Sequence, residues 1–249
     1  PKPVPKDGEL LVKVLAAGIC GSDIHARHDQ REVRMPVTLG HEFVGQVEET
    51  AGDVGSFRTG DWVVALPACY SCGECYLCQQ GLVTLCAKRA SIGSHVNGAM
   101  AEYVVVPAKY SFKIPDNTGD KAAYALTEPM GCVVRGIYER IDVKPGDVAV
   151  VSGPGTIGLF AVALMKSRGA YVIAAGLPDD RHRLELARAL GADATADSWD
   201  KLKEEVGKAS PKGADIAVEA AGAAGSLKTC VDILRAQGTL LQLGNYGKP

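Results

Sequence analysis

Four cysteines carry the most specific chemical pattern in the sequence. They are Cys72, Cys75, Cys78 and Cys86, closely spaced around glycines within residues 69–88. Four thiolates in a compact loop are typical ligands of a closed, tetrahedral structural zinc. Two disulfides or an iron–sulfur cluster could use the same thiols. We expect zinc, because a second set of metal-binding side chains occurs elsewhere, and because this lobe has no core of its own.

A second candidate ligand is His41, in the stretch Leu39-Gly40-His41-Glu42-Phe43-Val44-Gly45. Neighbouring residues on a strand point to opposite faces, so His41 and Glu42 need a bend or different partners. A lone histidine is more often a surface or hydrogen-bonded core residue. A catalytic zinc takes three protein ligands and leaves one position open. We nominate Cys20 and Glu128 as the other two ligands.

The third ligand has an alternative in the same segment. Proline favours the first turn of a helix, so Glu128-Pro129 should lie at a start or kink within a helix predicted over residues 122–140. Cys132 follows one helical turn later on the same face and is the rival ligand. Taken without any metal, Glu128 would be an ordinary carboxylate at a helix N-terminus.

A glycine motif follows a continuous apolar stretch, Val148–Ser152. The motif is Gly153-Pro154-Gly155-Thr156-Ile157-Gly158, and a helical pattern runs from it to Arg168. A GxGxxG motif between a buried strand and a helix indicates a dinucleotide site, whereas the glycines alone would indicate only a turn. We expect pyrophosphate contacts from Gly153, Gly155, Thr156, Ile157 and Gly158, because the glycines let the backbone approach and the helix start supplies N–H donors.

The next strand leaves the choice between NAD and NADP open. An NAD site usually has an acidic residue at the end of this strand, but here Tyr171–Ala175 is followed by Gly176. Arg181 and Arg183 lie shortly after it and favour the 2′-phosphate of NADP slightly. Asp179 or Asp180 is displaced from the usual position and would otherwise cap the helix that follows.

Composition excludes several classes of protein. The chain has 249 residues, is 47% hydrophobic and carries a formal charge of −2, so we expect one large or two ordinary globular domains, no nucleic-acid partner and no membrane segment. Eight cysteines in a chain of this size favour a reduced, cytoplasmic metalloprotein over a disulfide scaffold. The sequence begins without methionine or a signal peptide, and we expect a fragment truncated at both ends.

Two of these patterns resemble the zinc-containing medium-chain dehydrogenases of the alcohol dehydrogenase superfamily. They are Gly40-His41-Glu42 with Gly45, and Cys20-Gly21-Ser22-Asp23 with His25. Glu128-Pro129 is similar to the sorbitol and threonine dehydrogenase branch. The resemblance implies an α/β protein with a GroES-like β-rich catalytic domain, residues 1–145, and a doubly wound Rossmann domain, residues 146–249. About five strands follow Val148, where a full sheet has six, so the second domain should be incomplete.

The resemblance also implies an activity: hydride transfer between a secondary alcohol or polyol, sorbitol-like or threonine-like, and NAD or NADP. Zinc would polarise the substrate oxygen, Ser22 and His25 would carry its proton away, and Glu42 would lie beside the metal. Relatives assemble as dimers or tetramers, so a homo-oligomer is expected. The alternatives are a zinc-independent reductase of the same superfamily and a non-catalytic fragment that binds zinc or nucleotide.

Overall fold

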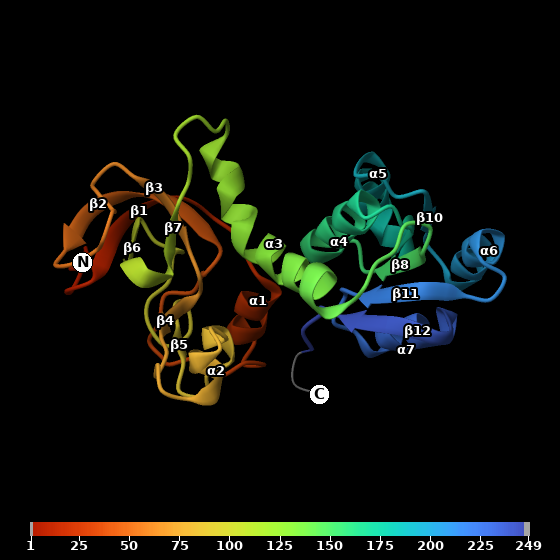
Figure 1. The fold of residues 1–249 in the computed structure, drawn as a ribbon, viewed down its shortest axis with the longest axis horizontal. Coiled ribbons are helices and arrows are strands. Elements are labelled where there is room, and N and C mark those ends of the chain that lie inside the picture. Colours follow the sequence, from red (N-terminus) through yellow and green to blue (C-terminus); the bar gives the residue numbers. More distant parts are fainter. Residues whose placement is uncertain (1, 247–249) are drawn as a thin grey trace. The chain divides into compact units, whose positions relative to one another are not determined.

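The computed structural model describes residues 2–246 and separates into two compact units, residues 1–128 and 129–249 (Figure 1). The helix α3 (Thr127–Val134) crosses this division. Each unit has its own sheet and its own hydrophobic core, and each is described by itself below.

The first unit is built on a five-stranded antiparallel sheet in the order β6-β1-β2-β3-β7. The alternating and apolar stretches of the sequence form these strands, which are β1 (Glu9–Ala17), β2 (Phe43–Ala51), β3 (Trp62–Ala65), β6 (Tyr103–Pro107) and β7 (Ser111–Lys113). Leu10, Val12 and Phe43 are almost fully buried in its core. Cys20 follows shortly after the end of β1.

Short elements surround this sheet. Helix α1 (Gly21–Arg27) begins directly after Cys20. The cysteine-rich lobe contains α2 (Tyr76–Gln79), one turn of 3₁₀ helix (Val83–Leu85) and a two-stranded sheet of β4 (Ala68–Tyr70) and β5 (Ala90–Ser91). Neither α2 nor the 3₁₀ turn buries a residue. Apolar packing of these two elements therefore cannot hold the shape of the lobe. Further 3₁₀ turns cover Ala108–Tyr110 and Lys121–Leu126.

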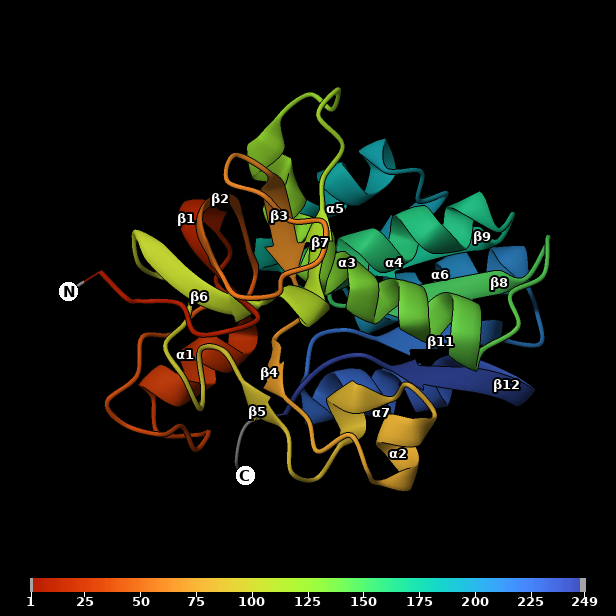
Figure 2. The same ribbon diagram turned by 60° about the vertical axis from the view of Figure 1, so that its left-hand side comes forward.

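The second unit is a parallel sheet with helices on both faces (Figure 2). Its order is β10-β9-β8-β11-β12, so the first strand in sequence lies at the centre and the chain winds outward in both directions, as in doubly wound folds. The strands are β8 (Val148–Ser152), β9 (Tyr171–Ala175), β10 (Ala194–Ala196), β11 (Ala214–Glu219) and β12 (Leu234–Gln242). The five predicted strands, including the weak one near Ala194, are confirmed.

Two apolar layers hold the helices to this sheet. Met165 of α4 (Thr156–Ser167) and Leu184 of α5 (Arg181–Ala189) belong to one layer. Leu202 of α6 (Trp199–Ala209) and Ile233 of α7 (Ala224–Ile233) belong to the other. Every residue of β8 is buried, which explains why its sequence is continuously apolar and does not alternate.

The division between the units falls earlier than the joint expected near residue 145. Val133, Ile137 and Val143 pack into the core of the parallel sheet, so the helical segment and the turn after it belong to the second unit. The helix predicted over 122–140 is a 3₁₀ turn, then α3, then a π-helical turn over Arg135–Arg140. Among the described helices, none is both long and apolar enough to cross a lipid bilayer.

Candidate metal sites and nucleotide pocket

The four thiols of the lobe converge on one point. The sulfur atoms of Cys72, Cys75, Cys78 and Cys86 all lie within 4.8 Å of one another. Cys72 Sγ lies 3.9 Å from Cys78 Sγ and 3.6 Å from Cys86 Sγ. A tetrahedral zinc with bonds of about 2.3 Å would separate its sulfurs by about 3.8 Å. All four are free cysteines in the structure.

The surroundings of these thiols shift their pKa values. The N–H groups of Cys75 and Glu74 lower the pKa of Cys72 to about 6. Desolvation and the neighbouring thiols raise the pKa of Cys78 to about 11. Without a cation, four adjacent thiolates would repel one another, so some of these thiols would stay protonated. A bound metal would displace those protons, as thiolate sites do when they load.

A second cluster forms in the first unit from Cys20, His41 and Glu42, whose ligand atoms lie within 4.8 Å of one another. Cys20 is the N-cap of α1, and His41 and Glu42 come immediately before β2. Because β2 begins at Phe43, these two neighbours lie outside the strand, and their side chains can turn to the same site. The bend that the sequence required is supplied by Gly40, whose φ is +95°.

Asp23 supports both Cys20 and His41. This carboxylate is almost fully buried, and its Oδ2 accepts a hydrogen bond of 3.0 Å from the N–H of Cys20. Its Oδ1 lies 3.7 Å from His41 Nδ1, which leaves Nε2 of the ring for a metal. Second-sphere carboxylates orient metal-ligating histidines in this manner. Burial alone would raise the pKa of Asp23, but its bonds to His41 and the backbone hold it below the usual value.

The charge balance of this cluster suits a cation. Burial would lower the pKa of His41, but the Asp23 carboxylate and the Cys20 thiol outweigh it and raise the pKa to about 10. The negative charge around His41 thus favours a positive charge at this point. A divalent metal would take over that positive charge, so the donor set fits zinc in both chemistry and electrostatics.

The structure brings Glu42, and not Glu128, into close contact with Cys20 and His41. A Cβ at Gly18 would lie 2.3 Å from Glu42 Oε2, so only glycine leaves this carboxylate room, and burial raises its pKa. Glu128 stands outside the group within 4.8 Å. Its pKa is raised chiefly by burial and also by the charges of Glu42 and Asp23, so it belongs to the same electrostatic surroundings.

A neighbouring segment fixes the loop that carries His41. Residues 98–100 pair with residues 38–40 through three backbone hydrogen bonds of 2.7 to 2.9 Å. Ala99 is buried in the core, whereas Met100 is exposed and packs over Gly40, where a Cβ would lie 2.7 Å from Met100 Cγ. His95, on the preceding loop, is exposed and its Nδ1 accepts from the N–H of Ser91. Residues 99 and 100 therefore contact the metal-ligand loop itself.

The proposed proton-carrying residues lie on α1. Ser22 is half-buried in its first turn, and His25 lies three residues later, a spacing that places both on one side of a helix. His25 Nδ1 lies 2.8 Å from Gln30 Oε1. Gln30 carries no sequence motif, and only the structure shows its contact with His25.

The three glycines of the nucleotide motif have three different surroundings. Gly153 has φ +100°, and a Cβ there would meet the backbone of Ala221 at 2.7 Å. A Cβ on Gly158 would lie 1.9 Å from the carbonyl oxygen of Gly153, so α4 packs directly on the loop. Gly155 has open space and is the N-cap of α4, next to the N–H groups of Thr156 and Ile157. That open face is where a pyrophosphate can approach the backbone.

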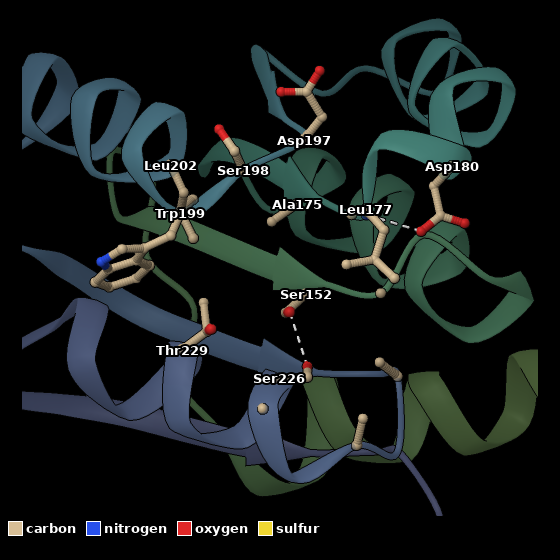
Figure 3. Close-up of a pocket in the computed structure, with 15 residues that line it drawn as sticks. Ser152, Ala175, Leu177, Asp180, Asp197, Ser198, Trp199, Leu202, Ser226 and Thr229 are labelled. Carbon is tan, nitrogen blue, oxygen red and sulfur yellow. Dashed lines mark hydrogen bonds between the residues drawn. The ribbon is translucent and has the colours of Figure 1, made fainter.

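A pocket of about 480 Å³ opens beside this loop, at the C-terminal ends of the parallel strands (Figure 3). Its middle contains Ser152, whose Oγ accepts a hydrogen bond of 2.9 Å from Ser226 Oγ. Leu177 and Asp180 lie toward one end and Trp199 toward the other (Figure 3). The position between β8 and β11, where the strand order reverses, is the usual nucleotide crevice of such sheets.

The acidic and basic residues after β9 pair with one another. Asp180 Oδ2 accepts from the N–H of Leu177 at 3.0 Å, and its Oδ1 pairs with Arg183 at 3.0 Å. Arg181 pairs instead with Glu185 at 3.5 Å. Neither arginine lines the pocket, but Arg183 contacts a residue that does.

Sequence comparison matches both units to known families. Residues 6–116 match the alcohol dehydrogenase GroES-like domain, and residues 156–249 match the zinc-binding dehydrogenase domain. The D-arabitol-phosphate dehydrogenase of Enterococcus avium is 37% identical over 250 residues, which are 98% of this chain and 70% of that protein. The sorbitol dehydrogenase of Halalkalibacterium halodurans is 37% identical over 251 residues, 100% of this chain and 73% of that protein.

The chain belongs to the zinc-binding alcohol dehydrogenase family. Solved structures of this family share its fold. A protein described as a zinc-binding dehydrogenase from Sinorhizobium meliloti 1021, bound to NADP, aligns with a TM-score of 0.89 at 37% identity and covers 99% of this chain and 72% of that one. Galactitol-1-phosphate dehydrogenase from Escherichia coli aligns with a TM-score of 0.86 at 27% identity, covering 98% and 70%.

Membership of the family confirms the predicted class of protein. The chain is an oxidoreductase of the zinc-binding alcohol dehydrogenase family, and its relatives include polyol and L-threonine dehydrogenases. The GroES-like and Rossmann-like folds predicted for its two parts are also confirmed. The chain spans 70% and 73% of the lengths of the two relatives named above.

Proposed function

We propose that this chain is a zinc-dependent dehydrogenase of secondary alcohols or polyols that prefers NADP. The observation that supports this best is the convergence of Cys20, His41 and Glu42 on one partly buried point, with Asp23 behind them. A divalent cation would balance the negative charge of such a cluster. A zinc-independent reductase has no use for this arrangement.

Each candidate site residue of the first unit has a role in this proposal. Cys20, His41 and a carboxylate hold the catalytic zinc, and the four cysteines of the lobe hold a structural one. When bound, zinc supplies a Lewis acid that makes the substrate hydroxyl more acidic, and the nicotinamide supplies the hydride acceptor. Ser22 Oγ takes the hydroxyl proton while its own proton passes to His25, which releases it to water. Asp23 keeps His41 oriented during this cycle.

Two carboxylates are candidates for the third ligand. The metal-free cluster favours Glu42, whereas the resemblance of Glu128-Pro129 to the polyol branch favours Glu128. We propose that Glu128 completes the loaded site and that Glu42 stays beside it. Zinc analysis of Glu42→Gln and Glu128→Gln distinguishes the two, because only loss of a ligand should lower the catalytic zinc content while the lobe keeps its own.

The preference for NADP rests on the end of β9. No acid follows the strand directly, and Asp180 is already occupied by the N–H of Leu177 and by Arg183. A carboxylate so engaged is poorly placed to hold ribose hydroxyls, whereas Arg183 can turn to a 2′-phosphate. The test is the ratio of kcat/KM for NADP over NAD, which should exceed one and fall in Arg183→Ala.

The function itself is tested by metal analysis and turnover. Two zinc ions per chain are expected, and activity should appear with polyols, phosphorylated polyols, L-threonine or simple secondary alcohols. Cys20→Ala should remove one zinc and the activity together. Unchanged turnover in that variant would refute the zinc mechanism and favour the zinc-independent reductase. Two bound zinc ions and bound nucleotide without any turnover would instead identify a non-catalytic fragment.

We also propose that the chain forms a homo-oligomer. The resemblance to medium-chain dehydrogenases, which assemble as dimers or tetramers, supports this proposal. Light scattering after size-exclusion chromatography should give a mass of two or four chains, and a monomer would contradict this proposal.

A further inference from the structure

Helix α1 ends in a turn that carries Gln30 back toward His25. Asp29 has φ +58°, and its N–H donates to the carbonyl of Ala26 at 3.3 Å. The N–H of Gln30 donates to the carbonyl of His25 at 2.8 Å. These two bonds and the left-handed residue between them define a Schellman motif. Aspartate is one of the few residues besides glycine that tolerates this conformation.

The side chain of Gln30 makes a second contact with the same residue. Gln30 Oε1 lies 2.8 Å from His25 Nδ1, so the backbone and the side chain of Gln30 both bond to His25. The structure turns the amide oxygen of Gln30 toward the ring, and because an amide oxygen only accepts hydrogen bonds, the imidazole donates from Nδ1 in this arrangement. A neutral ring with its proton on Nδ1 has its lone pair on Nε2.

We infer that Gln30 is a positioning residue that holds His25 in the Nδ1–H tautomer, with Nε2 ready to accept a proton. This inference rests on the proton path of the proposed function. In that path the Ser22 hydroxyl proton moves to Nε2 as Ser22 Oγ takes the substrate proton. The imidazolium then releases the Nε2 proton to water, and the Nδ1 proton remains with Gln30 throughout.

The amide suits this task better than a charged side chain would. Gln30 fixes the orientation of the ring without adding a negative charge that would retain the proton on the imidazolium. The clamp also needs the turn, because a residue unable to adopt a positive φ at position 29 would displace Gln30 from His25. The Schellman motif therefore connects the end of a short helix to the protonation state of one ring.

The direct test is nitrogen NMR of the zinc-loaded enzyme labelled with ¹⁵N-histidine. The chain has five histidines, and His25→Asn identifies the signals of residue 25. The wild-type ring should show a protonated Nδ1 and an unprotonated Nε2. Gln30→Leu should shift the population toward the Nε2–H tautomer, whereas Gln30→Glu should keep Nδ1 protonated because a carboxylate also accepts from it, and its charge should favour protonation of Nε2 as well. Asp29→Gly, which keeps the turn, is the matched control and should leave the pattern unchanged.

Kinetics adds a readout that a merely structural role would not give. Gln30→Leu should lower kcat about 10-fold, a fraction of the total that general acid–base catalysis supplies, with KM changed less than about twofold. Asp29→Gly should retain wild-type kcat and KM. A wild-type ring protonated at Nε2, an unchanged tautomer in Gln30→Leu, or an unchanged kcat in that variant would each overturn the inference. Absence of alcohol turnover by the wild type would refute the proposed function. The NMR experiment needs no substrate, so it tests the tautomer of His25 separately from turnover.

Discussion

The two glycines at the start of α4 provide a matched pair of substitutions with opposite expected effects. A Cβ added to Gly155 would meet no atom within 4 Å, and the residue has a negative φ, so Gly155→Ala should fold normally. Losing glycine at an N-cap costs up to about 1 kcal/mol, and the reduced freedom of the unfolded chain offsets about 0.4 to 1 kcal/mol of that. The net change in the free energy of unfolding should stay within about 0.5 kcal/mol.

The same methyl group should strongly affect nucleotide binding. It would occupy the open face through which a pyrophosphate reaches the first N–H groups of α4. We expect the Kd for NADP to rise at least about 30-fold, which corresponds to about 2 kcal/mol of lost binding free energy. Titration of NADPH fluorescence measures this directly, and it does not require turnover.

Gly158→Ala should show the reverse pattern. Its Cβ would lie 1.9 Å from the carbonyl oxygen of Gly153, so α4 or the loop must move by more than about 1 Å. Such overpacking costs about 1 to 3 kcal/mol, or roughly 2 to 12 °C in Tm for a chain of this size. Urea and thermal unfolding of both variants complete the test. Wild-type NADP affinity in Gly155→Ala, or wild-type stability in Gly158→Ala, would refute the assignment of the glycine roles.

Three further predictions concern other parts of the molecule. Cys86→Ser should release one zinc, measured by atomic emission, while the second zinc remains at the Cys20 site. Trp199→Ala should weaken binding of 2′,5′-ADP by about 1 to 3 kcal/mol and leave nicotinamide mononucleotide unaffected, because the indole lines the end of the pocket opposite Asp180; equal loss for both ligands would contradict a place for adenine at the indole. Burial would raise the pKa of Asp215, but the N–H of Val148 and Arg235 hold it below its ordinary value, so the folded chain takes up this proton at lower pH than the unfolded chain does. The contribution of the pair, about 1 to 2 kcal/mol, should be fully present above the unfolded pKa of about 4 and disappear as pH falls through the lowered folded pKa. Urea unfolding of wild type and Asp215→Asn from pH 7 to pH 3 should show the difference shrinking, and a constant difference would contradict the assignment.

Much of the fold was predictable because its signals are local. The spacing of the cysteines places four sulfurs in one short loop, whatever the rest of the chain does. The apolar run of β8 and the glycines after it specify a buried strand, a tight turn and a helix within about twenty residues. Such patterns do not depend on distant contacts, and they can therefore be recognised in a single sequence.

The details that the sequence did not decide depend on contacts between distant segments. The proximity of Glu42 to Cys20 follows from Gly18, whose missing side chain leaves the space that the carboxylate uses. The pairing of Asp180 with Arg183 follows from the first turn of α5, which the residue types alone did not fix. The contact of Gln30 with His25 depends on a left-handed Asp29, and aspartate adopts that conformation only where the surrounding turn requires it.

The backbone pairing of residues 98–100 with residues 38–40 has a consequence for protein engineering. Any substitution of Met100 also changes the packing over Gly40, immediately before His41. A variant selected at position 100 should therefore also be screened for zinc content, because a change in this packing can displace the loop that carries His41.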